Sequence, residues 1–264
     1  MAEHTAGSSP PVVLSIAGYD PSSGAGITAD IKTIAAHKCY GVTCITALTV
    51  QSTRGVRTVE PVEGRIISET LEELNSDLKI AAIKIGMLGS AEAARAVAAF
   101  LKRNQPPNVV LDPVLKSSSG ADLISGDGLA ILKQRLLGMA LVITPNAAEA
   151  GLLTGLTVST LQQIEEAALQ LRRAGARNVV VTGGHLEPPR DVLSLDGRQG
   201  VITLTGQKIS TSSTHGTGCA FSTALACRLA LGKSVLDAAR QAKSYVESAL
   251  KKAPKLGRGI GPVL

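Results

Sequence analysis

The sequence predicts an α/β fold with a mostly parallel central sheet, helices on both faces and a small antiparallel hairpin. Three observations predict it. Short apolar runs of β-strand type recur along the chain, most of them are separated by helical patterns, and a hairpin pattern follows near the carboxyl end. The strand-type runs cover residues 12–17, 43–50, 82–85, 108–111, 141–144 and 178–182.

Two of the intervening segments have the spacing of amphipathic helices. The first carries Ile27, Ile31 and Ile34 at positions i, i+4 and i+7. Thr160 and Gln163 have the spacing of a capping box and are expected to cap the start of the second helix. The apolar side chains that mark this second helix are Leu161, Ile164, Ala168 and Leu171.

Residues 191–210 depart from the alternation of strands and helices. Two strand-like stretches flank Asp196 and Gly197, which are typical turn residues, so this segment is predicted to form an antiparallel hairpin. In open α/β sheets, ligands bind beyond the carboxyl ends of the strands. The loops that follow the strand-type runs are therefore where the chemistry of this protein is expected.

The length of 264 residues allows one large α/β domain or two smaller ones. There is no long Pro/Ser/Gly tract, block of like charge or internal repeat between residues 12 and 250. One domain over residues 12–264 is therefore favoured, preceded by a disordered tail at residues 1–11.

The composition argues against several classes of protein. The net charge is +6, but the 27 basic and 21 acidic residues are scattered along the chain. With no Trp, two Phe and three Tyr, the chain also has few aromatic side chains on which bases could stack, so nucleic acid is not an expected partner. The mildly basic balance suits an anionic ligand such as a nucleotide. No apolar run approaches the ~18 residues of a membrane span, and residues 1–11 lack the apolar core of a signal peptide. The four cysteines have no zinc-ligand spacing, which indicates free thiols in the cytoplasm.

The most informative loop is Ser213-Thr-His-Gly-Thr-Gly-Cys219, which leads into an apolar helical stretch. Its glycines allow consecutive N–H groups to face an anion at the start of a helix, where the macrodipole also favours negative charge. Cys219 falls on the first helical turn, and the helix dipole there is expected to lower the pKa of its thiol. The alternative is a structural loop with a buried cysteine.

Two other loops have the features of a ligand pocket. Residues 17–27 are glycine-rich and precede Asp30, which could accept hydrogen bonds from an amino or hydroxyl group, although a tight turn with an exposed aspartate also explains them. The spacing of Gly24 and Gly26 does not match a dinucleotide fingerprint. Gln51 offers a donor and an acceptor to the edge of a heterocycle, and Met87 could pack on a flat ring or fill the core.

Acidic residues follow two later strands. Asp112 ends the strand-type run 108–111, where a Mg²⁺-organising carboxylate would lie in a kinase, although an aspartate before proline is also an ordinary turn. Glu149 has two interpretations. It could be a water-mediated Mg²⁺ partner near nucleotide phosphates, or its spacing from Asn146 could be that of a helix N-cap pair.

Eight segments together resemble hydroxymethylpyrimidine/phosphomethylpyrimidine kinase of thiamine biosynthesis. In order they are AGYDPSSGAGITADIKT, ITALTVQSTRGV, KIGML, VLDPV, TPNAAEA, TGGH, STHGTGCAFSTALA and GRGIGPV, spanning about residues 12 to 263. Ordered motifs at compatible spacing are more specific than any one of them. The resemblance implies a ribokinase-like fold and two successive ATP-dependent phosphorylations with Mg²⁺, first of the pyrimidine's hydroxymethyl group and then of the monophosphate.

The resemblance also implies roles for individual residues. Gln51 would bind the aminopyrimidine, in a pocket completed by Gly18, Asp30, Met87 and Val114. Asp112 and Glu149 would organise the metal, and the nucleotide would be bound by Thr144, Asn146, Thr182 and Gly184. The transferring phosphoryl would be met by N–H groups of Gly216, Thr217 and Gly218, and Cys219 would act as general base or polariser.

This chain departs from the family's pattern at three places. Thr182 and Ser118 stand where family members often carry lysines, so Lys116 or Lys84 would have to supply charge near the nucleotide. Tyr19 replaces a smaller residue in the first loop and would narrow the pocket.

Two alternative functions stay open on the sequence. Pyridoxal kinases are relatives that phosphorylate a ring of similar size, and a non-catalytic nucleotide or pyrimidine binder would have no need of the missing lysines. A homodimer is implied by the resemblance.

Overall fold

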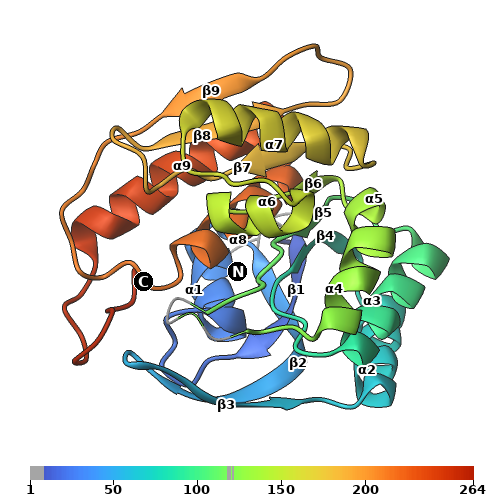
Figure 1. Cartoon of the computed structure of the whole chain (residues 1–264). Coiled ribbons are helices and arrows are strands. Elements are labelled where there is room, and N and C mark those ends of the chain that lie inside the picture. Colours follow the sequence, from blue (N-terminus) through green and yellow to red (C-terminus); the bar gives the residue numbers. More distant parts are fainter. Residues whose placement is uncertain (1–8, 118–119, 121) are drawn as a thin grey trace, which may run out of the picture.

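The strands form one sheet in the order β3-β2-β1-β4-β5-β6-β7-β8-β9 (Figure 1). The structure is a computed structural model that describes residues 9–117, 120 and 122–264. The strands are β1 (Val12–Tyr19), β2 (Tyr40–Ser52), β3 (Gly55–Pro61), β4 (Ile80–Ile85), β5 (Val109–Leu111), β6 (Val142–Ile143), β7 (Val179–Val181), β8 (Arg190–Ser194) and β9 (Ile202–Thr205).

The predicted parallel core is confirmed. β2, β1, β4, β5, β6 and β7 pair in parallel, and each contains or overlaps one of the apolar runs. The predicted hairpin is confirmed as β8 and β9, which pair antiparallel with Val192 opposite Thr203. The sequence did not predict β3, which turns back from β2 at Gly55 and pairs antiparallel along the sheet edge.

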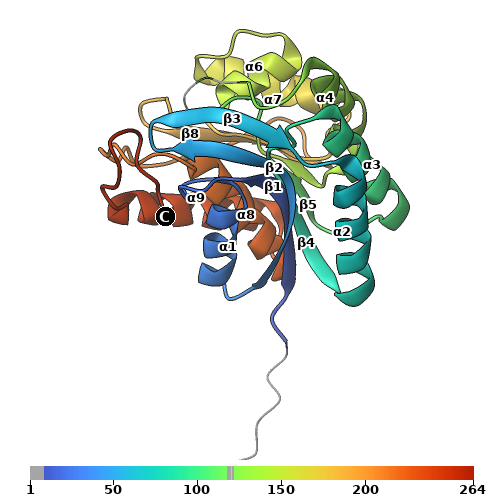
Figure 2. The same ribbon diagram turned by 90° about the horizontal axis from the view of Figure 1, so that it is seen from below.

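Helices cover both faces of the sheet (Figure 2). α1 (Gly26–Ala36), α8 (Thr217–Ala230) and α9 (Val235–Lys252) pack on one face. The other face carries α2 (Gly64–Asp77), α3 (Ala91–Asn104), α4 (Gly126–Ile131), the π-helical turn η1 (Leu132–Leu136), α5 (Leu137–Met139), α6 (Ala147–Thr154) and α7 (Leu161–Arg173).

The strands β5, β6 and β7 are apolar throughout because both of their faces are covered. In β5, Val110 points into the core beneath α8 and α9, whereas Val109 and Leu111 point into the opposite core. Val180 in β7 lies in the same core as Val110, and its neighbours Val179 and Val181 lie in the other. This alternation explains why the strands appear in the sequence as continuous apolar runs rather than as an apolar and polar repeat.

Both amphipathic helices form where their spacing predicts. Thr160 Oγ1 accepts from Gln163 N at 3.3 Å, and Gln163 Oε1 accepts from Thr160 N at 3.1 Å, so the predicted capping box is confirmed. In α1, Ile27 and Ile34 are buried. Ile31 is 37% exposed and packs over Gly41 of β2.

The predicted N-terminal tail falls only partly within the described residues. Residues 1–8 lie outside them, so their predicted disorder stays a prediction. Pro11 already extends the pairing of β1 with β2, because its carbonyl accepts from Tyr40 N at 2.9 Å. No helix in the described part of the chain is long and apolar enough to cross a membrane.

Candidate active site

A cavity lies at the carboxyl edge of the parallel strands, opposite the N-terminus of α8. Most of the residues predicted for the site line this cavity. They are Gly18, Gln51, Met87, Asp112, Val114, Thr144, Asn146, Glu149, Thr182, Gly216, Thr217, Gly218 and Cys219. Gly184 lines an adjoining cavity, and Asp30 lines neither. Tyr19 is also part of the cavity wall.

The loop before α8 depends on its first glycine. Gly216 is the N-cap of α8 with φ of 84°, and it has no side chain to accept hydrogen bonds from the first helical turn. A Cβ added to Gly216 would lie 1.8 Å from the carbonyl oxygen of Gly24, so the two glycine-rich loops pack backbone to backbone. Gly216, Thr217 and Gly218 at the start of α8 line the cavity, where the positive end of the helix dipole would stabilise an anion.

The two glycines of this loop make a matched pair for mutation. Gly216→Ala is expected to destabilise the protein by about 2–4 kcal/mol, because it combines a left-handed backbone with a collision against Gly24. Gly218→Ala is the control, since a Cβ there meets no atom within 4 Å. Urea unfolding of both variants measures the difference, and equal stability of the two would contradict this account of the loop.

The predicted effect of the helix on Cys219 is wrong. Burial raises the pKa of the Cys219 thiol to about 12, and the charges of Asp112 and Asp30 add to this while Lys84 opposes it. The residue itself is partly exposed, because it lines the cavity. Desolvation and the neighbouring carboxylates thus move the pKa in the direction opposite to the prediction, and the thiol is neutral at pH 7.

Asp112 and Glu149 bring two carboxyl groups to the cavity. Burial raises the pKa of Asp112, against the opposing effects of Lys84 and a 2.9 Å hydrogen bond from Ser222 Oγ. Burial together with the charge of Asp112 raises the pKa of Glu149 to about 8. Glu149 also completes the predicted capping box, because its Oε2 accepts from Asn146 N at 2.9 Å.

These side chains fit a Mg²⁺ ion. The two carboxyl groups repel each other in the protein alone, and Thr144 Oγ1 beside them is buried with no hydrogen-bond partner. A divalent cation would relieve the repulsion and accept an oxygen ligand. Across residues 9–117, 120 and 122–264, no three His, Cys, Asp or Glu side chains gather at a metal site, so phosphate oxygens and water would complete the coordination.

Asp30 lies beneath the cavity. Its carboxylate is fully buried and accepts from Lys84 Nζ at 2.9 and 3.2 Å, from Ser15 Oγ at 2.6 Å and from Thr223 Oγ1 at 2.7 Å. Burial alone would lower the pKa of Lys84, but Asp30, with Cys219 and Asp112, raises it. The carboxylate predicted to bind substrate is thus turned toward an internal cation, and its own hydrogen bonds join α1 to β1, β4 and α8.

The cations of the site are placed differently from the family's pattern. Ser118 lies outside the described residues, and Thr182 N is bound to Pro145 O at 2.9 Å. Lys116 and Lys84 both line the cavity, but Lys116 pairs with Asp122 at 2.6 Å and Lys84 is fully buried. The adjoining cavity, which shares Thr182, Thr214, Thr217 and Gly218 with the first, is lined by Lys208 and Lys243.

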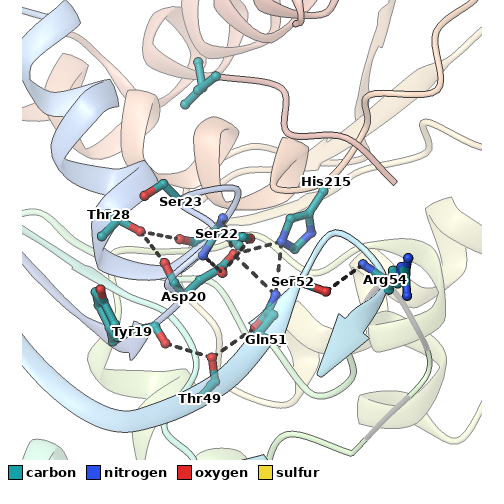
Figure 3. A network of polar contacts seen from close by, with 12 residues as sticks. Tyr19, Asp20, Ser22, Ser23, Thr28, Thr49, Gln51, Ser52, Arg54 and His215 are labelled. Atoms are coloured by element: carbon teal, nitrogen blue, oxygen red, sulfur yellow. Dashed lines mark hydrogen bonds and ion pairs between the residues drawn. The ribbon is translucent and has the colours of Figure 1, made fainter. Parts of the chain in front are cut away.

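Asp20 and His215 were missed by the reasoning from sequence. Asp20 Oδ2 accepts from His215 Nε2 at 3.0 Å, from Gln51 Nε2 at 3.3 Å and from Ala25 N at 2.9 Å, while Oδ1 accepts from Ser22 (Figure 3). Burial would raise the pKa of Asp20, but the hydrogen bonds from His215, Ser22 and Ala25 together lower it. The only signal in the sequence was the place of Asp20 and His215 inside two glycine-rich loops.

The lowered pKa of Asp20 makes a prediction about acid stability. The folded carboxyl group binds protons less tightly than the unfolded one, so its contribution is complete above the unfolded pKa of 3.8 and is lost as pH falls below it. Asp20→Asn is expected to lose this part of the pH dependence, and its melting temperature should fall less than that of the wild type between pH 5 and pH 3. If the melting temperatures of the two proteins fall in parallel between pH 5 and pH 3, the prediction is contradicted.

A family model described as phosphomethylpyrimidine kinase matches residues 20–264. This chain belongs to that family. Hydroxymethylpyrimidine/phosphomethylpyrimidine kinase of Escherichia coli is 43% identical over 253 residues, which are 95% of each protein. The thiamine biosynthesis bifunctional protein ThiED of Geobacter sulfurreducens is 41% identical over 95% of this kinase, and the kinase spans 51% of that longer protein.

A solved structure supports the fold. Bacillus subtilis pyridoxal kinase in complex with ADP matches this kinase with a TM-score of 0.88 and 34% identity, over 96% of each chain. The ribokinase-like fold and the kinase family that the sequence motifs implied are confirmed. This solved structure is named for a substrate other than the pyrimidine, so fold alone does not select the acceptor.

Proposed function

We propose that this kinase transfers the γ-phosphoryl group of ATP to the hydroxymethyl group of 4-amino-5-hydroxymethyl-2-methylpyrimidine, and then a second phosphoryl group to the monophosphate, for thiamine biosynthesis. The observation that carries the proposal is one cavity that joins Gln51, the start of α8 and the acidic pair Asp112 and Glu149. Phosphoryl transfer needs chiefly the positioning of two reactants and stabilisation of negative charge. The cavity supplies groups for both.

The acceptor would lie between the loop after β1 and the ends of β2 and β4. Gln51 offers hydrogen bonds to the ring edge, while Gly18, Met87 and Val114 line the space that a flat ring would fill. The hydroxymethyl group would point toward Cys219 on the first turn of α8. Cys219 would polarise that hydroxyl or accept its proton. The neutral thiol found here favours the first of these roles.

ATP would lie across the boundary of the two cavities. Thr182, Thr217 and Gly218 line both, so a nucleotide in the second cavity would direct its phosphates to the start of α8. Thr144, Asn146 and Gly184 would complete its binding. Lys208 would supply the positive charge that Thr182 lacks, since Lys243 is paired with Asp191 at 2.7 Å.

Asp112 and Glu149 would hold Mg²⁺, with Thr144 nearby. The bound ion would neutralise charge on the phosphoryl oxygens. The part played by the chain itself is to keep both carboxyl groups at the cavity wall, through the hydrogen bond of Ser222 to Asp112 and the capping box of Glu149.

A product assay tests the proposal. The purified kinase is incubated with ATP, Mg²⁺ and one acceptor at a time: the hydroxymethylpyrimidine, its monophosphate or pyridoxal. Formation of the monophosphate and then the diphosphate is expected. Pyridoxal phosphate as the only product would favour the pyridoxal kinase alternative, which the match to the Bacillus subtilis enzyme keeps in view. No ADP with any acceptor, despite measurable binding, would indicate a regulator.

We also propose that the kinase is a cytoplasmic homodimer, as the family resemblance implies. Light scattering during gel filtration tests the assembly, and an elution mass near 27.1 kDa would contradict it.

A further inference from the structure

The side chain of Gln51 is held at both ends by the network in Figure 3. Its Nε2 lies 3.3 Å from Asp20 Oδ2 and 3.2 Å from His215 Nε2, and its Oε1 lies 3.2 Å from Thr49 Oγ1. The three partners come from β2 and from the loops that follow β1 and precede α8. The orientation of the Gln51 amide is therefore set by parts of the chain that are distant in sequence.

Asp20 decides which end of the amide faces it. An ionised carboxylate can only accept hydrogen bonds, and the pKa of Asp20 is lowered by the donors around it. Because the Nε2–H of His215 is directed at Asp20, the 3.2 Å contact between Gln51 Nε2 and His215 Nε2 is not a hydrogen bond, and the charge of Asp20 sets the orientation of the amide. Rotating the amide by 180° would place Gln51 Oε1 against the negative Asp20 Oδ2, in a site where Asp20 is only 3% exposed. The NH₂ group therefore faces Asp20, and the carbonyl oxygen faces away from it.

The carbonyl oxygen of Gln51 is left short of a donor. Its neighbour Thr49 has one hydroxyl hydrogen but two acceptors within reach, Tyr19 O at 2.9 Å and Gln51 Oε1 at 3.2 Å. The closer acceptor is Tyr19 O, so Gln51 Oε1 keeps its capacity to accept. Gln51 lines the cavity, where a ligand N–H group could reach this oxygen.

We infer that Asp20 is a positioning residue that fixes Gln51 as a hydrogen-bond acceptor, and that the site thereby selects acceptor rings with an N–H donor on the edge facing Gln51. This inference rests on the proposed function and adds the origin of its specificity. The exocyclic amine of the aminopyrimidine satisfies the acceptor. A ring with a formyl oxygen at that place, as in pyridoxal, sets two acceptors against each other and is disfavoured.

The inference is tested with two acceptor compounds that differ only in the amino group that would donate to Gln51. They are 4-amino-5-hydroxymethyl-2-methylpyrimidine and its analogue without the amino group, each assayed for kcat/KM with ATP and Mg²⁺. For the wild type, kcat/KM is expected to be about 10- to 100-fold higher for the compound with the amine. This is the range expected when losing one hydrogen bond leaves a buried acceptor without a partner. Asp20→Asn presents an amide that can donate, which allows Gln51 to rotate, and the preference is expected to fall by at least about tenfold.

A ratio of kcat/KM values separates positioning from a general structural effect. If Asp20 only supports its loop, Asp20→Asn lowers kcat/KM for both compounds in parallel and leaves the ratio unchanged, which would overturn the inference. Ser22→Ala is the matched control, since it removes a bond to Oδ1 but leaves the Oδ2 side intact, and its ratio should match that of the wild type. Gln51→Met, which has no strong acceptor, is expected to bring the ratio near one and serves if Asp20→Asn does not fold.

The outcomes also separate this inference from the proposed function. A wild type that phosphorylates neither compound refutes the proposed function. If the wild type phosphorylates both compounds with equal kcat/KM, the protein is still a kinase acting on hydroxymethyl rings, but the role of Gln51 as a selective acceptor is overturned.

Discussion

Replacing Cys219 with alanine is expected to lower turnover in the first phosphorylation by about 10²- to 10³-fold at saturating substrate, the usual cost of removing one preorganised polar group at the reacting atoms. Cys219 is on the first turn of α8, beside Gly218, and it lines the cavity with Asp112. Its thiol is the group of that turn proposed to polarise the hydroxyl of the acceptor. The measurement is kcat for the hydroxymethylpyrimidine with ATP and Mg²⁺ held at saturation.

The control for Cys219 lies on the same helix. Cys227 is fully buried in the core between α8 and α1 and lines neither cavity, so Cys227→Ala changes a thiol of α8 without touching the reactants. Its kcat should stay near that of the wild type even where its stability falls. A Cys219→Ala variant whose kcat is within a few-fold of the wild type would remove Cys219 from the chemistry and leave positioning and electrostatics to carry the reaction.

Local patterns in the sequence predicted the features that depend on local physics. Buried parallel strands appear as apolar runs, and the hairpin shows its turn residues at Asp196 and Gly197. The capping boxes at Asn146 and Thr160 each involve residues three apart, so their spacing alone identified them. Because the ends of parallel strands meet at one edge, the loops that carry most of the candidate site were also predicted.

What the sequence did not predict depends on residues far apart along the chain. Asp20 meets His215 across 195 positions, and no spacing rule relates them. Asp30 was predicted to face substrate because it follows a glycine-rich loop, but its partner Lys84 lies on β4 and turns it inward. The pKa of Cys219 was predicted from the helix dipole alone, whereas burial and two carboxylates determine its direction.

Replacing Lys84 with methionine is expected to lower the free energy of unfolding by about 3–5 kcal/mol, the usual cost of leaving one partner of a buried ion pair without its counter-charge. Lys84 and Asp30 both have fully buried side chains and lie 2.9 Å apart. Without the ammonium group, the Asp30 carboxylate keeps only the hydroxyl donors Ser15 and Thr223. Urea denaturation at pH 7 measures the loss. Arg65→Ala, which breaks an exposed pair with Glu69, is the control and should cause no comparable loss.

A double variant separates the structural role of this pair from its electrostatic role. Lys84→Met combined with Asp30→Asn removes both charges, and the introduced amide can still bond Ser15 and Thr223, so much of the lost stability should return. Turnover should not return with it. The positive charge of Lys84 opposes the upward pKa shifts of Asp112 and Cys219, and both lie at the cavity wall. A double variant as active as the wild type would show that Lys84 only holds α1 against the sheet, whereas a stable but slow one would place its charge among the groups that support phosphoryl transfer.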